Sequence, residues 1–515
     1  MGRAGNGPPP FLGTDGCCRL PLVTFLIPFF AVGLAVLTAA PAHAQQDRSI
    51  LEAAGLYAPS VWDLEIGAHA SELPTSEYID FACGTGGGPP SLPLTGWTEF
   101  TKCSAEEGTG FHEVYFQYDD EPEYWARARR LDTQVELYKH TSAYAIPVIV
   151  SALFDGDGFM VGFRMVSDPR VDVAIREKGS DLAGFLMARY DGAEWACENL
   201  PRLEGEREFK GDFFKSRCEQ YEPIVGLDLI IERHLLRKAG QFAINPADGL
   251  PMTGQFESMS LLEVTLAAGI PGRESRLAAL ADPGPSERGQ LIQRALACPG
   301  CDLTGSNFKR ANLSGANLSG ANLSGANFHG ATLAGANLSG AILVKANLNR
   351  ADVKRANLHE ADLSEAMMFR ARFDGADLSG ARLQGAFGGE VQMIGATVTN
   401  ANLSLMDLRE ARLNDADFSG SNINNAWLNN AQMARSVFVG ANLIFTSLRF
   451  ASMVLTDFSQ ADVRGSDLFG ANLRGANLTD TDFSHSRLTN VNLSEAQATG
   501  AKFVDALLPA GFEPQ

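Results

Sequence analysis

The motif with the clearest chemical potential is Cys298-Pro299-Gly300-Cys301, which places two thiols three positions apart. A redox pair of this spacing normally opens a helix that follows a strand, where the helix terminus lowers a thiol pKa. Here the motif instead follows residues 291–297, whose spacing is that of a short amphipathic helix. No second cysteine pair or histidine pair stands near enough to complete a zinc site. We interpret the motif as a local disulfide or structural cap, with redox and metal sites as the alternatives.

Three polar segments could hold a ligand. Residues 84–88 are rich in glycine but lack the Gly-Lys-Ser/Thr ending of a phosphate loop, and prolines follow them instead of a helix. Residues 119–123 and 155–157 carry carboxylates without the full spacing of a calcium loop. The Gly-X-Ser-X-Gly and His-Glu-X-X-His motifs are absent from the sequence. We therefore expect no catalytic, cofactor-binding or metal site, although groups in residues 45–270 could still meet in space.

The elements that would position these residues fall into more than one domain, because 515 residues exceed what one compact core supports. Residues 45–300 hold 40 Asp and Glu against 23 Lys and Arg, whereas residues 301–505 hold 19 against 17. The first part is acidic and the second is nearly neutral. Neither offers the basic surface that neutralises phosphates, so we expect no nucleic-acid partner.

The first 44 residues have the pattern of a signal peptide. Arg3 and Arg19 precede an apolar run over residues 20–40, and Ala42-His43-Ala44 follows it with small residues at the two recognition positions. Cleavage after Ala44 would leave Gln45 at the N-terminus and place the protein in the periplasm or outside the cell. The run is also long enough to span a bilayer, so a membrane anchor over residues 20–40 is the alternative.

Six cysteines follow the expected cleavage site: Cys83, Cys103, Cys197, Cys218, Cys298 and Cys301. An even number in an exported chain favours disulfides, because oxidising compartments let them persist. The separations of 20 and 21 positions favour Cys83–Cys103 and Cys197–Cys218. Sequence alone still allows fifteen pairings of six cysteines.

The strongest pattern is a repeat of five residues that runs from Cys301 to Asp505 without insertion or deletion. Of the 41 positions numbered 303, 308 and onward to 503, all are Leu, Phe, Val, Ile or Met except Gly388 and Ala498. Two residues before each centre stands Ala, Ser, Thr or Cys, as in Ala311-Asn312-Leu313, with Val391, Met406 and Val491 as the exceptions. A period of five matches neither a helix nor a flat strand, so the chain must turn regularly.

This pattern resembles the pentapeptide-repeat family, whose motif is Ala-(Asp/Asn)-Leu-X-X. The resemblance implies a mainly β fold over residues 301–505: a right-handed quadrilateral parallel β-helix of about ten coils, with four pentapeptides in each. Such a rod needs covered ends. We expect residues 290–301 to cap the N-terminal end and residues 506–515 the other.

Residues 45–270 form an acidic α+β domain that resembles no family we can name, and residues 271–289 read as a linker rich in Pro and Gly. Alternating or apolar runs predict strands at 111–118, 146–154, 159–166 and 258–266. Helical spacing predicts helices near 181–190 and 227–236.

A twenty-residue coil stacks outward positions that differ by multiples of twenty. Met367, Phe387 and Trp427 then share one column, and Phe369 and Phe469 lie on the same face. Aligned apolar side chains commonly mark an interaction surface, so we expect these five residues to bind a protein partner or a second copy. The alternative is an intramolecular contact, in which the irregular segment at 386–395 or the N-terminal domain covers this face.

These observations favour an exported, non-catalytic binding or scaffolding protein that presents the faces of a rigid rod to a partner. The alternative is an envelope enzyme with its active site in residues 45–270 and the rod as a spacer. Mimicry of DNA, which the family also implies, fits poorly because the rod is nearly neutral.

Overall fold

The computed structural model describes residues 60–86, 88–139, 141–190, 194–222, 226–238, 256–267, 270, 273–280 and 287–512. The expected signal peptide, its cleavage site and the apolar run at 20–40 lie outside these residues. Within the described part of the chain, no helix combines the length and apolar character needed to cross a membrane.

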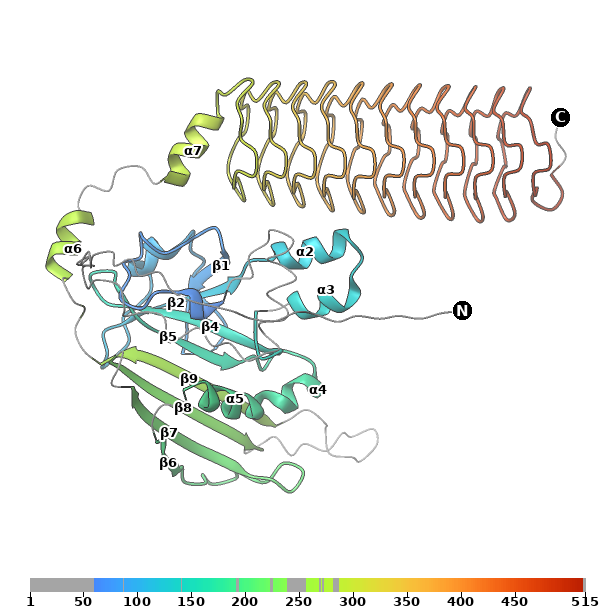
Figure 1. The fold of residues 1–515 in the computed structure, drawn as a ribbon. Helices are drawn as coiled ribbons and strands as arrows, with labels where there is room; N and C mark the ends of the chain where they lie inside the picture. The colour runs from blue at the N-terminus through green and yellow to red at the C-terminus, as the bar shows by residue number, and fades with distance from the viewer. Residues whose placement is uncertain are drawn as a thin grey trace, which may run out of the picture. The chain divides into compact units, whose positions relative to one another are not determined.

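The N-terminal domain is built on one nine-stranded antiparallel sheet of order β1-β2-β4-β5-β9-β8-β7-β6, with β3 beside β4 (Figure 1). Its strands are β1 (Tyr78–Cys83), β2 (His112–Tyr118), β3 (Ser142–Ala143), β4 (Ile146–Phe154), β5 (Met160–Ser167), β6 (Ala196–Asn199), β7 (Phe214–Glu222), β8 (Leu227–Leu236) and β9 (Glu257–Leu266). The domain is therefore mainly antiparallel β-sheet, which is richer in β-structure than our α+β expectation.

Four of these strands, β2, β4, β5 and β9, lie where alternation in the sequence predicts them. The helix expected near 227–236 is wrong, because these residues form β8, paired with β7 on one side and β9 on the other. Leu227, Leu229 and Ile231 alternate with more exposed residues along it. Apolar residues recur there at both helical and strand spacing, and two flanking strands decide between them.

Aromatic side chains fill the core under the first half of the sheet. Trp97 is buried and meets Tyr78, Phe81 and Phe116 edge-on, with ring centroids 4.7–5.5 Å apart. Edge-to-face pairs add to the stabilisation from burial alone. This packing gives a fixed base to β2, the strand that leads into α2 (Glu121–Ala128).

The helices are short and lie before, between or after the strands. They are η1 (Val61–Asp63), η2 (Trp97–Lys102), α2 (Glu121–Ala128), α3 (Asp132–Tyr138), α4 (Val173–Arg176), η3 (Glu177–Asp181), α5 (Leu182–Arg189), α6 (Arg273–Leu280) and α7 (Glu287–Ala295). The expected linker thus contains α6, where Arg276 donates to the Gly67 carbonyl at 2.7 Å and to Glu72 at 2.6 Å. Helix α7 leads into the rod, and Ala295 belongs to the rod core.

The described residues include three disulfides, Cys83–Cys103, Cys197–Cys218 and Cys298–Cys301. They indicate an oxidising compartment.

Reduction of the two long-range disulfides is expected to destabilise the N-terminal domain. Each closes a loop of about 20 residues, which contributes roughly 3 kcal/mol by restricting the unfolded chain. Peptide mapping without reductant should recover both pairs, and Cys83→Ser with Cys103→Ser should lower the midpoint of urea unfolding. Recovery of these thiols free or cross-paired would contradict the assignment.

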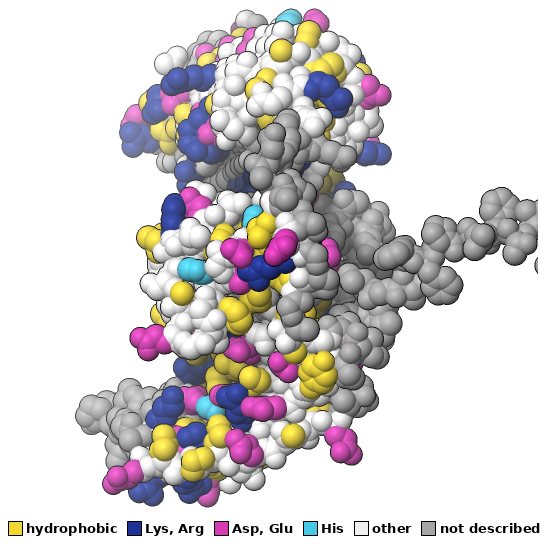
Figure 2. Space-filling model, turned by 90° about the vertical axis from the view of Figure 1, so that its left-hand side faces the viewer, with side chains coloured by type: hydrophobic (Ala, Val, Ile, Leu, Met, Phe, Trp, Pro, Cys, Tyr) yellow, Lys and Arg dark blue, Asp and Glu magenta, His cyan; other side chains and the backbone are white. Residues whose placement is uncertain are grey.

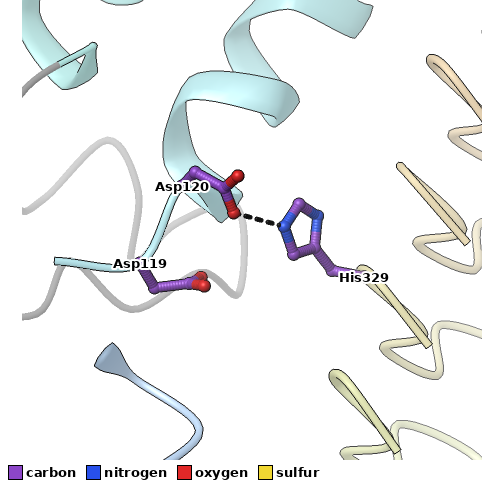
Figure 3. A group of neighbouring side chains, drawn as sticks. All are labelled: Asp119, Asp120 and His329. Atoms are coloured by element: carbon purple, nitrogen blue, oxygen red, sulfur yellow. Dashed lines mark hydrogen bonds and ion pairs between the residues drawn. The ribbon is translucent and has the colours of Figure 1, made fainter. Parts of the chain in front are cut away.

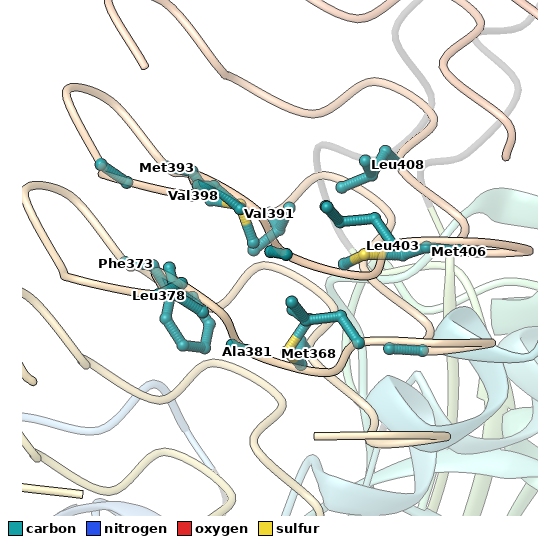
Figure 4. Close-up of a cluster of buried hydrophobic side chains, with 14 of the residues drawn as sticks. Met368, Phe373, Leu378, Ala381, Val391, Met393, Val398, Leu403, Met406 and Leu408 are labelled. Atoms are coloured by element: carbon teal, nitrogen blue, oxygen red, sulfur yellow. The ribbon is translucent and has the colours of Figure 1, made fainter. Parts of the chain in front are cut away.

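Residues 297–507 form the β-helix, whose successive coils are drawn in Figure 1. Parallel bridges join residues twenty apart, from Ala297–Asn317 to Arg487–Leu507, so four pentapeptides make one coil. The central apolar residue and the small residue two before it point inward and are buried along the rod, as Met368, Phe373 and Leu378 do in Figure 4. Phe418, Phe438 and Phe458 stack in consecutive coils at 4.9 and 5.0 Å.

The corners of the coil impose a second requirement. Every residue numbered in multiples of five, from Gly305 to Asp505, has a positive φ. Only glycine adopts this conformation without a steric penalty, and Asn and Asp tolerate it better than other side chains. The corner position is therefore often Gly, while Leu405, Phe445, Phe450 and Leu455 are its apolar exceptions.

Candidate functional site

The largest concentration of buried charge lies where the N-terminal domain meets the rod, at the start of α2. Strand β2 ends at Tyr118, and Asp120 occupies the N-cap position before a helix with Pro122 in its first turn. Pro122 suits the first turn because it needs no hydrogen bond there, and the Asp119 carboxylate accepts the Glu121 amide hydrogen at 3.0 Å. Helices α2 and α3 form a pair, here called the α2–α3 hairpin, that packs on one face of the rod.

Lys309 is the centre of this contact. Its ammonium lies 2.8 Å from Asp119, 2.8 Å from Glu121 and 2.9 Å from Glu77, and the side chain is 1% exposed. Glu121 also accepts hydrogen bonds from the amides of Asn327 and Asn347, at 2.7 and 2.8 Å. A buried charge is tolerated only when it is paired and hydrogen-bonded, and here one cation serves three carboxylates.

Asp120 makes the second part of the contact. His329 on the rod is fully buried, and its Nε2 lies 2.9 Å from the Asp120 carboxylate (Figure 3). A carboxylate only accepts, so this nitrogen carries the hydrogen. Arg310 lies 2.6 Å from the same carboxylate, and Arg350 also pairs with it. We call these eight residues the ionic cluster: Glu77, Asp119, Asp120, Glu121, Lys309, Arg310, His329 and Arg350.

The electrostatics of the ionic cluster favour the charged carboxylates. Burial raises the pKa of Asp120, but the hydrogen bond from His329 and the charges of His329, Arg310 and Arg350 outweigh it and hold the pKa well below its usual range. Burial likewise opposes the ionisation of Asp119, and Lys309, His329 and Arg310 again lower its pKa. Burial alone would lower the pKa of Lys309. The three carboxylates raise it by more, so the net pKa lies above its usual value and the amine stays charged.

Acid is expected to loosen the contact between the hairpin and the rod. A carboxyl whose pKa is depressed in the folded state stabilises that state above its unfolded pKa of about 3.9, and the contribution is lost as the pH falls toward the folded value. Hydrogen exchange of the α2 amides should be constant between about pH 5 and pH 8, after correction for the intrinsic rate, and should rise below about pH 4. Asp120→Asn should weaken this dependence. A rise of equal size in β4 would instead indicate general acid unfolding.

Asp119, Asp120 and His329 also have the chemistry of a metal site, since their ligand atoms lie within 4.8 Å of one another. Their environment does not fit a cation. Lys309 and Arg310 already bind Asp119, while Arg310 and Arg350 bind Asp120. These cations occupy the positions from which a metal would attract the carboxylates, so the geometry is that of a salt-bridge network.

An apolar contact extends the ionic cluster along the rod. Met367 is 8% exposed and packs with Trp125, Ala126 and Val135 of the hairpin, and Phe387 packs against the same group.

Two further contacts lie beside this apolar group. Tyr124 meets Phe369 edge-on at 6.0 Å, and farther along Arg130 pairs with Asp407 at 3.3 Å. Met367, Phe369 and Phe387 thus lie in an intramolecular contact with the N-terminal domain, the alternative that the sequence left open, and binding of a separate partner through them stays a prediction.

Trp427 and Phe469 are the two expected partner-binding residues that the hairpin leaves accessible. Trp427 is exposed and Phe469 is half-buried. Whether they bind a partner stays a prediction.

The glycine-rich segment has a structural explanation. A side-chain carbon at Gly84 would lie 2.4 Å from the Glu113 side chain, and the Gly86 amide donates to that carboxylate at 2.6 Å. Glu113 in turn pairs with Arg164 at 3.0 Å, which also binds Glu263 at 2.7 Å. The loop closes over a buried carboxylate and does not cradle a phosphate.

The acidic turn at 155–157 also serves the fold. Asp155 accepts the amide hydrogens of Asp157 and Phe159 at 3.0 Å, and its other oxygen lies 3.1 Å from Arg273 of α6. This acidic turn is thus a point of attachment for α6.

One cavity of about 660 Å³ opens on the N-terminal domain, beside the stacked rings of Tyr144 and Phe185. Lys178, Asp181 and Arg233 supply its charged lining. The residues that line it include no Ser, Cys or His.

The model of the family "Pentapeptide repeats" matches eight stretches of the chain, which together lie within residues 301–505. This segment is a pentapeptide-repeat domain. The match excludes the N-terminal domain, and no curated protein sequence matches the chain.

Solved structures of other pentapeptide-repeat proteins are similar to this one. HetL, involved in heterocyst differentiation regulation in the cyanobacterium Nostoc sp. strain PCC 7120, is 27% identical over 44% of this chain and 98% of its own, with a TM-score of 0.23. A protein of the Arabidopsis thaliana thylakoid lumen is 27% identical over 25% of this chain and 79% of its own, with a TM-score of 0.16. QnrB1, a plasmid-mediated fluoroquinolone resistance protein, is 20% identical over 41% of this chain and 92% of its own, with a TM-score of 0.18.

Reasoning from sequence missed the ionic cluster, although the pentapeptide repeats contain a signal for it. The position after the centre is often Ser, as in Ser314, Ser319 and Ser324, but one column carries Lys309 and His329 instead. Lys354 and His359 stand at the same position in other columns. Only Lys309 and His329, however, place two basic or imidazole side chains one coil apart, and such a pair indicates a covered face. Their acidic partners, however, lie about 190 to 230 positions away.

Proposed function

We propose that this chain is an exported scaffolding protein without catalytic activity, in which a pentapeptide-repeat rod and an acidic domain are held in fixed register. Export is supported by the Ala42-His43-Ala44 pattern and by the three disulfides. The periplasm or the extracellular space is the expected location.

The observation that carries the proposal is Lys309 bound by three carboxylates. Asp119, Asp120 and His329, an acid and histidine group of the kind that catalytic sites use, are all paired within this contact between domain and rod. An enzyme would need such groups free to reach a substrate. A scaffold needs them only to keep two binding surfaces at a constant distance.

The surface charges support a protein partner over a nucleic acid. On the face drawn in Figure 2, Lys and Arg side chains are interspersed with Asp and Glu, and no continuous basic stripe is visible. Nucleic-acid binding depends on such a stripe. Protein partners accept a mixed surface, because complementary charges set their orientation.

Purification of the protein from the envelope fraction of its host tests the proposal. We expect Gln45 at the N-terminus and a complex of fixed stoichiometry by native mass spectrometry. An intact Met1 in the membrane pellet would indicate the anchor over residues 20–40. Saturable turnover by the full chain, abolished by one substitution in the cavity at Tyr144, would instead support the envelope enzyme.

A further inference from the structure

Aromatic side chains outside the core of the rod occur on one of its four faces. The aromatic residues of 301–505 that are not central are Phe369, Phe387, Trp427, Phe445, Phe450 and Phe469. Bridges between residues twenty apart assign each to a column. All six lie on the face that includes Lys309 or at the two corners that flank it. The other faces carry polar or small residues and a few aliphatic ones at outward positions.

The α2–α3 hairpin covers the first two of these residues and stops near Asp407, where Arg130 pairs with the rod. The other four continue the same face toward the C-terminus, and we call them the aromatic patch: Trp427, Phe445, Phe450 and Phe469. Trp427 is 43% exposed, Phe445 66% and Phe450 53%. Large apolar side chains gain no stability from such exposure.

The conformation of two patch residues adds a cost. Phe445 and Phe450 are corner residues with φ of 56° and 57°, where a side chain other than Gly, Asn or Asp is disfavoured by roughly 1–2 kcal/mol. The next coil has Gly465 and Gly470 at these corners, and a side-chain carbon there would lie 2.5 and 2.7 Å from the rings. Gly465 and Gly470 therefore leave space for the rings of Phe445 and Phe450, although these exposed rings contribute little burial to the fold. Strained residues of this kind concentrate at ligand-binding sites.

Two arginines give the aromatic patch a positive charge. Arg449 lies over Phe450 and Phe469 at 5.8 and 5.2 Å, and Arg487 lies over Phe469 at 4.5 Å. Both share a single carboxylate, Asp467, at 3.2 and 3.7 Å. The part of the face that the hairpin covers also pairs arginine with an aromatic ring. There Arg350 of the rod lies over the Tyr124 ring of the hairpin at 4.9 Å.

We propose that the aromatic patch binds one amphipathic helix of a partner protein, with acidic residues beside aromatic ones, an inference that rests on the proposed scaffold function. The face already binds a helix of this chemistry, because α2 places Glu121 and Glu123 in its first turn and Tyr124 and Trp125 after them. The positive arginines favour an acidic segment.

The size of the patch also selects a helix over a second copy. It spans three coils, about 10 Å along the rod at ~4.8 Å between strands, and a helix is about 10 Å across. A stable dimer buries roughly 800 Å² on each partner, more than three coils of one face present.

Fluorescence anisotropy with a defined peptide tests the proposal. The probe is a labelled 20-residue helical peptide that copies the α2 arrangement, with two Glu in its first turn followed by adjacent Tyr and Trp. We expect it to bind the full chain saturably at 0.15 M salt. Peptides with Lys in place of Glu, or Ser in place of Tyr and Trp, should bind at least about tenfold more weakly.

Variants of the corners identify the surface. Phe445→Asn with Phe450→Asn should weaken binding at least about tenfold and leave thermal unfolding unchanged or raised, because Asn425 and Asn430 occupy equivalent corners in this rod. Leu455→Asn is the matched control: it removes an exposed apolar corner residue from a different column, and binding should not change.

Equal binding to the corner variant and the parent chain would overturn the proposal, as would equal binding of the Ser peptide. A dimer of the full chain that the corner variant converts to monomer would also overturn it in favour of self-association. None of these results would contradict the proposed scaffold function. That proposal is contradicted by a different result, the absence of a stoichiometric complex in the envelope fraction.

Discussion

Lys309→Met is expected to destabilise the attachment of the N-terminal domain to the rod by about 3–5 kcal/mol. The substitution leaves Asp119, Glu121 and Glu77 beside one another without their shared cation, at a position where the lysine is 1% exposed. Removal of one member of a buried ion pair costs more than the pair itself contributes, because the remaining charges stay desolvated. Hydrogen exchange of α2 and the first transition in urea unfolding measure the loss.

Lys345→Met is the control, since it makes the same substitution at an exposed lysine. Lys345 lies 3.6 Å from Glu365, with both side chains more than half exposed, and such surface pairs contribute about 0–1 kcal/mol. If the two variants lose the same amount of stability, the ionic cluster does not hold the domain and the rod together.

Phe438→Ala is expected to destabilise the rod by about 3–5 kcal/mol. Phe438 is fully buried between Phe418 and Phe458, with ring centroids 4.9 and 5.0 Å away, so its removal opens a cavity that neighbouring coils cannot close. Urea unfolding followed by circular dichroism measures the change.

Phe450→Ala makes the same substitution at an exposed corner and should change the free energy of unfolding by less than about 1 kcal/mol. If Phe450→Ala destabilises the rod as much as Phe438→Ala, the assignment of central and outward positions is wrong.

The rod could be predicted from the sequence because its contacts follow a fixed local period. A centre such as Leu313 meets its neighbours twenty positions along the chain, and the same two inward positions recur in every repeat. Each pentapeptide therefore carries the information for its own place in the coil.

The N-terminal domain lacks such a period, and its misassigned parts depend on distant partners. Residues 227–236 form a strand because β7 and β9 flank them, although their apolar spacing also suits a helix. The acidic segment at 119–123 looks like a solvated loop until Lys309, about 190 positions away, is placed against it. Burial of that charge is a property of the assembled fold.

The distance between two spin labels tests most directly whether the domain and the rod form one rigid scaffold. Thr133→Cys on α3 and Arg382→Cys on the rod offer exposed attachment points while the native cysteines after residue 44 remain paired. We predict one narrow distribution of distances near neutral pH, which broadens in Lys309→Met and stays narrow in Lys345→Met. A broad distribution in the unsubstituted background would contradict a fixed register between domain and rod.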